Sequence, residues 1–403
     1  MRAVFVNHCH PETPHVCAVR AREFAAELAR QGHRIVLLTE TLRPEEDAEP
    51  PDGFAARLAA HDWSVPLRLA GAPRGHRLLR RQRAGRLPAV VSKLAVASAY
   101  VTSRSVFPDW GAGCTPYIPA LAERFRPDIV WANFGNTEGL LIGRRIARVA
   151  RCPWIVDVKD YWSTFIPAPF RRFLARTVAD AAAMTALSQG HVNDVRPYFP
   201  KDLTQNATVI HSGVPNSFAG PPEPATPETG RILIVGALYN SVALDRLIAG
   251  IEAAARETGL PRTVEYAGDQ GAMVRARAEG RPGIAAVRDH GYVALDRLHA
   301  LQRTAGVNAF IRSGPGWFQH KVPELLTAGR PILCIPGADA ETAALARRAR
   351  VPFHGCETAD AVAAALVAET RNRAPVPDID FIAGLTWAHR ADLLGRTLQD
   401  HCR

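Results

Sequence analysis

The sequence predicts an α/β protein of two domains, each built on a parallel β-sheet. Three observations predict this class. Apolar runs short enough for buried strands alternate with helical patterns along almost the whole chain, which is typical of βαβ units. A segment rich in Pro, Glu and Thr, 218–229, interrupts the alternation with the composition of an interdomain linker. At 403 residues, the chain is also long for a single core.

The N-terminal half begins with a βαβ unit. Its parts are a strand at 3–7, a helix from about Cys17 to Gln31 that Gly32 stops, and a strand at 34–39. Acidic residues and prolines then predict a loop insertion over 41–60, and the stretch 70–125 is mainly helical in pattern. The alternation resumes with strands at 128–132, 154–157, 184–188 and 207–210 and helices at 137–150 and 170–183.

The C-terminal half repeats the alternation. Strands are expected at 231–235, 263–267, 284–288, 307–311, 331–335 and 351–353, and helices at 242–257, 295–302, 322–328, 339–348 and 360–368. We therefore expect an N-terminal domain over 1–217, the linker at 218–229 and a C-terminal domain over 230–383. The cleft between two such domains is the expected ligand site.

The composition is that of an ordinary soluble globular protein, with 47% hydrophobic and 22% charged residues. No run approaches the ~18 consecutive apolar residues of a membrane span. The N-terminus enters a strand pattern at once, without the apolar region and cleavage site of a signal peptide. The seven cysteines form no CxxC pair, which suits reduced thiols. Together these observations predict a cytoplasmic protein.

The formal net charge is +10, which suits an anionic ligand, a nucleic acid or an anionic membrane. Much of the excess is local, at Arg74, His76, Arg77, Arg80, Arg81, Arg83, Arg86 and Lys93. Leucines and valines alternate with these charges, so the region 74–100 could lie on the inner face of a membrane as a peripheral helix. The alternative is a solvated, arginine-rich face. Nucleic-acid binding is not expected, because no aromatic ladder accompanies the charge.

The most informative stretch is 321–332, which reads KVPELLTAGRPI. Lys321 and Glu324 stand three residues apart at the start of a short helix that ends at Gly329, so they share one face about one turn apart. A cation and a helix N-terminus suit a diphosphate, and a carboxylate suits the two hydroxyls of a ribose. One face could therefore hold both halves of a nucleoside diphosphate. The alternative is a surface ion pair between the two side chains.

This stretch resembles the nucleotide-sugar signature of retaining GT-B glycosyltransferases of the GT4-like group, the glycosyltransferase family 1 or group 1 type. Three further segments resemble the same family, in order along nearly the whole chain: 7–39, then 126–131 with 153–162, and 209–215. The resemblance implies a GT-B fold, in which two Rossmann-like domains face a central cleft. It also implies that a C-terminal helix, 384–403, packs back onto the N-terminal domain.

For the C-terminal domain, the resemblance implies a nucleotide-sugar site. Lys321 and Arg312 are the expected catalytic cations on the diphosphate, and Glu324 is the expected ribose ligand. Glycines at strand ends would let a phosphate approach the backbone closely. The other expected donor-binding residues are Gly236, Asn240, Asp269, Tyr292, Ser313, Gly314, Gly316, and Leu325 and Leu326 through their backbone amides.

For the N-terminal domain, the resemblance implies an acceptor site. Asp160, at a strand end, could orient an acceptor hydroxyl or take its proton; alternatively, it caps the helix that follows. The expected acceptor-binding residues are His10, Glu12, Thr13 and His15 in the first loop, and Asn133, Asn136 and Thr137 after a later strand. The first loop also contains Cys9 and Cys17, but the spacing matches no usual zinc pattern, so no metal is expected.

The sequence departs from the family at four places. Gly316 stands where many members carry a glutamate eight residues before Glu324. The run after Gly236 lacks the usual Arg and Lys, and the paired glycines of the acceptor loop are replaced around His15. Asn133 stands where some relatives have a histidine near the reacting carbon. These departures concern donor orientation and the residue that would act as base, and they leave the fold prediction unchanged.

The leading hypothesis is a retaining glycosyltransferase, of the hexosyltransferase type, that needs neither metal nor cofactor. It would move a sugar from a UDP- or GDP-sugar to a glycan, lipid-linked or small-molecule acceptor, with protein cations neutralising the leaving diphosphate. Two alternatives stay open: a GT-B UDP-sugar epimerase, and a non-catalytic sugar-nucleotide-binding protein of the same fold. An NAD-dependent dehydrogenase is disfavoured, because no GxGxxG motif opens either half.

Overall fold

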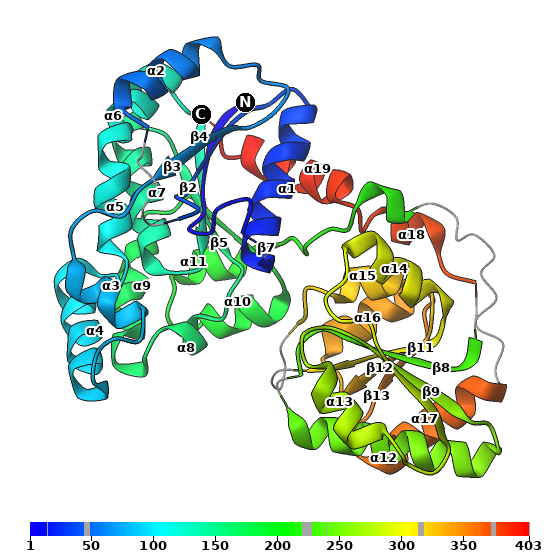
Figure 1. The fold of residues 1–403 in the computed structure, drawn as a ribbon. Coiled ribbons are helices and arrows are strands. Elements are labelled where there is room, and N and C mark those ends of the chain that lie inside the picture. The colour runs from blue at the N-terminus through cyan, green and yellow to red at the C-terminus, as the bar shows by residue number, and fades with distance from the viewer. Residues whose placement is uncertain are drawn as a thin grey trace. The chain divides into compact units, whose positions relative to one another are not determined.

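The chain folds into two compact units: unit 1, Met1–Ser212 with Arg390–Arg403, and unit 2, Gly213–His389 (Figure 1). The computed structural model describes residues 1–13, 15–43, 49–219, 228–238, 240–312, 318–371 and 376–402. Each unit contains one sheet, and all its paired strands run parallel, with helices between them. The predicted fold class of two Rossmann-like parallel-sheet domains is confirmed.

Unit 1 has seven strands in the order β3-β2-β1-β4-β5-β6-β7. They are β1 (Arg2–Val6), β2 (Arg34–Glu40), β3 (Leu67–Gly71), β4 (Ile129–Phe134), β5 (Trp154–Val158), β6 (Ala183–Ala186) and β7 (Thr208–Val209). The central strands are short apolar runs buried on both faces, as parallel sheets usually are. Every residue of β4 is buried, and Trp131 packs against Phe5 of β1 with ring centroids 4.7 Å apart.

Several helices of unit 1 begin where the sequence supplies a side-chain cap or a proline. α7 (Thr137–Ala150) covers the predicted range, because the side chain of Asn136 accepts a hydrogen bond from the backbone N–H of Gly139 (3.2 Å). The others are α1 (Val16–Arg30), α2 (Pro51–Ala60), α3 (Arg77–Arg83), α4 (Ala89–Ser103), α5 (Pro108–Cys114), α6 (Ile118–Ala120), α8 (Trp162–Phe165), α9 (Arg171–Ala175), α10 (Gln189–Val195) and α11 (Lys201–Gln205).

Two predictions for unit 1 are wrong in detail, and one strand was missed. The stretch 41–60 is not all loop, because Pro51 starts α2 and Phe54 and Leu58 bury one of its faces; residues 44–48 lie outside the described residues. Within 170–183 the α-helix ends at Ala175, since the chain must turn back to begin β6 at Ala183. Strand β3 was not predicted, because its alternation extends over only five residues.

Unit 2 has six strands in the order β10-β9-β8-β11-β12-β13. They are β8 (Glu228–Val235), β9 (Arg262–Ala267), β10 (Ile284–Asp289), β11 (Ala305–Ile311), β12 (Ile332–Ile335) and β13 (Phe353–Gly355). The helices are α12 (Ser241–Thr258), α13 (Gly271–Ala278), α14 (Leu295–Thr304), α15 (Val322–Thr327), α16 (Ala340–Arg348), α17 (Ala359–Arg371) and α18 (Ile379–Ala383). Helix α13 was not predicted, because it lacks a continuous apolar stripe.

Most of the predicted linker, 220–227, lies outside the described residues. It is preceded by a 3₁₀ turn at Asn216–Ala219 and followed directly by β8. The last helix, α19 (Trp387–Gln399), begins in unit 2 and continues into unit 1. There, Nε2 of Gln31 donates a hydrogen bond to Asp392 (2.7 Å), and Leu28 packs close to Gly395.

In both sheets the strand order reverses beside the first strand, between β1 and β4 in unit 1 and between β8 and β11 in unit 2. Ligands of open parallel sheets bind outside the carboxyl ends of the strands at such a point. The segments after these four strands are therefore the places where functional side chains are expected. In the part of the chain that the structure describes, no helix is both long and apolar enough to cross a bilayer.

Candidate functional site

Lys321 lies immediately before α15 and reaches the carboxyl end of β8. Its Nζ donates a hydrogen bond to the carbonyl of Val235 (3.1 Å) and lies 5.8 Å from the ring centroid of Phe310. Burial lowers the pKa of Lys321 to about 8, although Glu324 opposes the shift. The structure therefore places at this strand end an ammonium group that an added anion would stabilise.

Gly236 follows β8, and because it has no side chain, the side chain of Lys321 can lie against it. Its φ is +80°, a conformation that residues with a side chain rarely adopt. A Cβ at this position would lie only 2.3 Å from Nζ of Lys321. The sequence predicted that Gly236 lets a phosphate approach the backbone, and this stays a prediction; in the structure, Nζ of Lys321 lies in the space beside Gly236.

Glu324 lies in the first turn of α15 and is partly buried. Its Oε1 accepts a hydrogen bond from Nε2 of Gln302 on α14 (2.5 Å). Burial raises the pKa of Glu324 to about 6, although Gln302 and Lys321 oppose the rise. Lys321 and Glu324, both of them described, form no ion pair with each other, and each has its own partner. The alternative of a surface ion pair is therefore wrong.

Gln302 is a site residue that the sequence did not reveal. It is fully buried, and its Oε1 has no hydrogen-bond partner within the described ranges. One turn earlier on the same helix, Nε2 of His299 lies 3.2 Å from the hydroxyl of Thr327. Helix α14 therefore holds α15 at two points. Nothing in the sequence links Gln302 to Glu324, because their contact depends on how two helices pack.

Arg312 follows β11 directly, and its side chain is buried, with the residue only 5% exposed. Its backbone N–H donates to the carbonyl of Ile335 (2.8 Å), which continues the sheet pairing. Its Nε and Nη1 are buried and have no hydrogen-bond partner among the residues that the structure describes. A buried guanidinium without an anion is unfavourable, so this position is suited to receive one.

The other predicted donor-binding residues have varied surroundings. Asn240 caps α12, with its side chain accepting from the backbone N–H of Ala243 (3.0 Å). Asp269 and Tyr292 are exposed, Tyr292 by 84%. Among the described residues, these positions show no contact that would define a site.

The backbone of α15 is less available than the sequence suggested. Leu325 and Leu326 are fully buried, and the N–H of Leu325 already donates to the carbonyl of Lys321 (3.0 Å). This intrahelical bond takes the amide of Leu325 away from a phosphate, which corrects the expectation for that group. The predicted donor residues Ser313, Gly314 and Gly316 lie outside the described residues.

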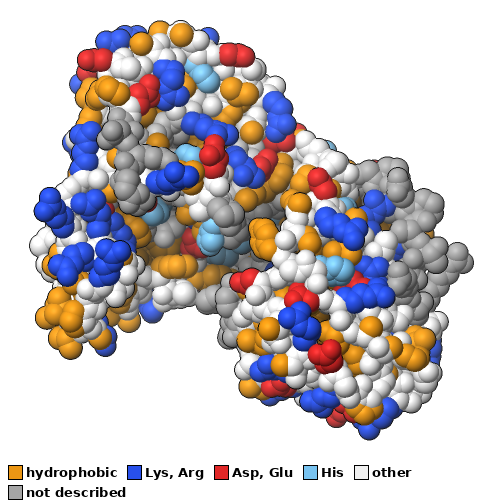
Figure 2. Space-filling model, in the orientation of Figure 1, with side chains coloured by type: hydrophobic (Ala, Val, Ile, Leu, Met, Phe, Trp, Pro, Cys, Tyr) orange, Lys and Arg blue, Asp and Glu red, His pale blue; other side chains and the backbone are white. Residues whose placement is uncertain are grey.

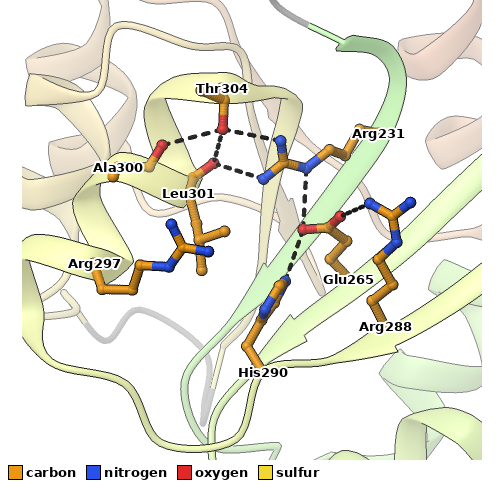
Figure 3. Close-up of a pocket in the computed structure, with 8 residues that line it drawn as sticks. All are labelled: Arg231, Glu265, Arg288, His290, Arg297, Ala300, Leu301 and Thr304. Carbon is orange, nitrogen blue, oxygen red and sulfur yellow. Dashed lines mark hydrogen bonds and ion pairs between the residues drawn. The ribbon is translucent and has the colours of Figure 1, made fainter.

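A separate cavity of about 270 Å³ opens between α14 and the strands β8 to β10 (Figure 3). At its centre the carboxylate of Glu265 pairs with Arg231 (3.0 Å), Arg288 (3.2 Å) and His290 (2.9 Å). Burial alone would raise the pKa of Glu265, but these partners outweigh it and lower the pKa. The cavity is lined by Arg231, Glu265, Arg288, His290, Arg297, Ala300, Leu301 and Thr304. None of the predicted site residues lines it.

In unit 1, the loop after β1 holds the four predicted acceptor residues, and much of its bonding is internal. Nδ1 of His10 accepts from the backbone N–H of Glu12 (3.2 Å), and the N–H of Thr13 donates to the carbonyl of His10 (3.0 Å). Glu12 is exposed and pairs with Arg68 of β3 (3.0 Å). His15 caps α1, its Nδ1 accepting from the N–H of Cys17 (3.2 Å).

Asp160 lies beside the thiol of Cys17, with Oδ2 3.9 Å from Sγ, and accepts a hydrogen bond from Nζ of Lys159 (3.0 Å). A hydrogen bond from Cys9 lowers the pKa of Cys17 to about 6, and the same interaction raises the pKa of Cys9. Asp160 does not cap α8, because Tyr161 holds the cap position and no side chain caps this helix. The helix-cap alternative for Asp160 is therefore wrong.

Cys9, His15 and Cys17 are the only potential metal-ligand group found among the described residues, with ligand atoms within 4.8 Å of one another. Two sulfurs and an imidazole are ligands that zinc accepts. The ammonium of Lys159 lies close to this group, since it donates to the neighbouring Asp160, and it opposes a divalent cation electrostatically. The spacing of these residues in the sequence does not predict such a site, because the three come together only in the folded loop.

The residues predicted for the acceptor at the end of β4 are buried and bonded within the unit. Nδ2 of Asn133, inside β4, donates to Oδ2 of Asp157 (3.0 Å). Asn136 caps α7, and the hydroxyl of Thr137 donates to the carbonyl of Arg104 (2.7 Å). Their assignment to the acceptor stays a prediction, and each now has a structural role.

A buried ion pair that the sequence did not reveal joins α1 to β5. Nε and Nη2 of Arg20 donate to the two carboxylate oxygens of Asp157 (3.1 and 2.9 Å), and both side chains are fully buried. Nη1 of Arg20 donates to the carbonyl of Ile210 (2.8 Å), and the hydroxyl of Thr185 donates to Asp157 (2.8 Å). Two parallel bonds fix the geometry of this pair.

Comparison with known proteins adds a match to a family model over part of the chain. Residues 17–210 match the family model described as a glycosyl transferase 4-like domain. A search of curated protein sequences found no match.

Several solved structures are similar over the whole chain. HepE (Alr3699) from Anabaena, in complex with UDP-glucose, has a TM-score of 0.54 and 14% identity and covers 99% of this chain and 95% of its own. The UDP-GlcNAc 2-epimerase from Methanocaldococcus jannaschii has a TM-score of 0.56 and 9% identity, covering 99% and 100%. OtsA in its apo form has a TM-score of 0.58 and 12% identity, covering 99% of each chain.

At these identities, the structural likeness shows the fold, which is GT-B, and the family model matches the N-terminal part of that fold. Taken with two parallel sheets in the same strand order, the matches give one conclusion. The fold of the whole chain is GT-B, and residues 17–210, just under half of the chain, are similar to the glycosyl transferase 4-like domain.

Proposed function

We propose that this protein is a retaining glycosyltransferase that takes a sugar from a UDP- or GDP-sugar without a metal ion. The observation that carries the proposal is a pair of cations at the ends of β8 and β11. Lys321 lies against Val235 and Gly236, and Arg312 is buried with two unpartnered N–H-bearing nitrogens in the described structure. Burial raises the pKa of Cys334 in β12, and the charges of Arg312 and Lys321 both oppose this rise. Both cations therefore lie near the same thiol.

In the proposed reaction, the bond between the sugar C1 and the diphosphate oxygen breaks. Lys321 and Arg312 neutralise the charge that develops on the departing diphosphate, which is the largest electrostatic demand of the reaction. The acceptor oxygen bonds to C1 on the face that the diphosphate leaves, so the configuration is retained. The acceptor proton passes to an oxygen of the departing phosphate, and no protein base is required. Glu324 accepts from the ribose hydroxyls and fixes the donor in place.

Uracil is the first donor base to test, because the HepE structures similar to this chain contain UDP or UDP-glucose. The acceptor is proposed to be a glycan, a lipid-linked glycan or a small molecule that meets the loop after β1. Asp160 is the proposed contact for its hydroxyl, since its Oδ2 lies at the carboxyl end of β5 next to Cys17.

The experiment measures release of UDP or GDP from a panel of nucleotide sugars, with and without candidate acceptors and with a chelator present throughout. The proposal expects release that depends on an acceptor and a product with the anomeric configuration of the donor, read by NMR. Asp160→Asn is expected to raise KM for the acceptor more than KM for the donor.

The alternatives give different results in the same assay. An epimerase would invert a centre of the donor sugar without any acceptor. A sugar-nucleotide-binding protein would bind UDP and release nothing from UDP-sugars. If a chelator abolishes the activity and zinc restores it, the proposal that no metal is needed is overturned. Cys9, His15 and Cys17 would then be the candidate ligands of the zinc site.

A further inference from the structure

The hairpin of α3 and α4 in unit 1 carries apolar side chains that no described residue covers. On its inner side, α4 buries Ala95 and Ala99 in a small cluster with α3. On its outer side, Val90, Leu94 and Val101 are 70%, 65% and 64% exposed. Their spacing places these three side chains on one stripe of the helix, opposite the buried one. Helix α4 is therefore apolar on two faces, and only one of them is packed.

The same hairpin carries a surplus of positive charge. Residues 63–108 contain nine Lys or Arg and no Asp or Glu. Among the described residues, only two of these cations pair with a carboxylate: Arg68 with Glu12, and Arg83 with Asp109. The cations of the hairpin without such a pair are Arg77, Arg80, Arg81, Arg86 and Lys93. Figure 2 shows Lys and Arg gathered over α3, with hydrophobic side chains beside them over α4.

We propose that the α3–α4 hairpin docks unit 1 on the surface of an anionic lipid bilayer. The outer stripe of α4 enters the boundary between headgroups and acyl chains, and the cations of α3 contact lipid phosphates. Stable attachment at an interface usually needs two signals, and this surface supplies both apolar area and basic charge. The cations concentrate the protein near an anionic leaflet, and the apolar side chains hold it there.

The alternatives explain only half of this surface. A nucleic acid would use the arginines, but it offers nothing to the aliphatic stripe of Val90, Leu94 and Val101. The hairpin, all of whose residues are described, also has no exposed aromatic side chain that could stack on bases. A solvated basic face would explain the arginines and leave the same stripe in water. A bilayer surface matches both components.

The docking proposal rests on the proposed function only for the reason why the protein would bind a membrane. It would bring the loop after β1, where the acceptor is proposed to bind, to acceptors that are held in a membrane. Vesicle binding is measured without donor or acceptor, so a failure of docking and a failure of sugar transfer are separate results.

The test uses the full chain in vesicle flotation at physiological ionic strength. One set of vesicles is pure phosphatidylcholine, and the other contains phosphatidylglycerol as well. The wild type is expected to float only with the anionic vesicles. The variant Arg77→Glu/Arg81→Glu is expected to lose affinity on the order of 100-fold, because each basic residue near the surface contributes to the attraction. The variant Val90→Ser/Leu94→Ser is expected to bind at low salt and to be released as salt rises.

Matched controls change the same residue types elsewhere. Arg124→Glu/Arg256→Glu alters two exposed arginines, and Val149→Ser/Val242→Ser alters two exposed valines. These controls should float like the wild type, and all variants should keep the wild-type melting temperature. The proposal is overturned if the wild type stays off anionic vesicles, if the hairpin variants float as well as the controls, or if the chain binds duplex DNA and not vesicles.

Discussion

Lys321 and Glu324 show how burial tunes two neighbouring side chains in opposite directions. Loss of solvent lowers the pKa of Lys321 to about 8 and raises the pKa of Glu324 to about 6, because burial disfavours the charged form of each. Between these values both groups are charged, as the proposed contacts with diphosphate and ribose require. The burial of these two side chains therefore sets the pH range in which both are charged.

This pair predicts the pH dependence of donor use. The value of kcat/KM for the donor should fall as pH drops below about 6, where Glu324 takes up a proton, and as pH rises above about 8, where Lys321 loses one. In the Lys321→Arg variant, the fall of kcat/KM on the alkaline side should move to higher pH, since a guanidinium keeps its charge. A flat profile from pH 5 to 10 in the wild type would contradict the assignment.

Removal of either side chain predicts a loss of turnover with little loss of stability. Lys321→Ala and Glu324→Ala should each lower kcat/KM by about 100-fold or more, as loss of a transition-state contact usually does. The matched control is Lys201→Ala, an exposed lysine on α11, which should behave like the wild type. Unchanged activity in both site variants, with melting temperatures preserved, would refute the site.

At the scale of elements, α15 shows that a short helix depends on its neighbours. Six residues are too few for a helix that is stable alone, because nucleation costs more than so few bonds return. Gln302 and His299 of α14 hold it from one side, and the buried side chains of Leu325 and Leu326 anchor it in the core. The sequence predicted the helix from its boundaries, while its orientation comes from α14.

The contact between α1 and β5 predicts a large effect on stability. Arg20→Met leaves Asp157 buried without its partner, and this should lower the free energy of unfolding by about 3–5 kcal/mol. On the same helix, Arg30 pairs with Glu27 from a position that is 55% exposed, although Glu27 itself is only 8% exposed, so Arg30→Met should cost less, about 1 kcal/mol. Urea unfolding of the two variants measures the difference. Equal, small effects would show that the buried pair does not stabilise unit 1.

At the scale of the whole molecule, the two units repeat one strand order and differ in the segments at the strand ends. Unit 2 places Lys321, Glu324 and Arg312 near the reversal point of its sheet, whereas unit 1 places a loop with thiols and histidines there. The fold therefore supplies two similar edges, and the side chains give each edge its own chemistry.

This division predicts how ligands change thermal stability. UDP or GDP at 100 times its Kd should stabilise the native protein by about 2.7 kcal/mol and raise its melting temperature. Lys321→Ala should lose most of this shift, whereas Lys201→Ala should keep it. A full shift in Lys321→Ala, measured by differential scanning fluorimetry, would place the nucleotide away from α15.

Local patterns in the sequence were enough to establish the alternation of strands and helices and the location of most elements. Apolar runs and helix caps are local signals, so α7 was predicted to the residue and α15 to within one. Weak local signals failed: β3 is a short edge strand, α13 lacks an apolar stripe, and α2 was hidden in an acidic stretch.

Which side chains meet is established only in the folded chain. Gln302 reaches Glu324, Arg20 reaches Asp157, and the space at Gly236 belongs to Lys321, although long stretches of chain separate each pair. Folding also determines which apolar residues of α4 face outward. These outcomes depend on the packing of distant elements and on burial, which shift pKa values and leave polar atoms unpartnered, and no local pattern in the sequence encodes them.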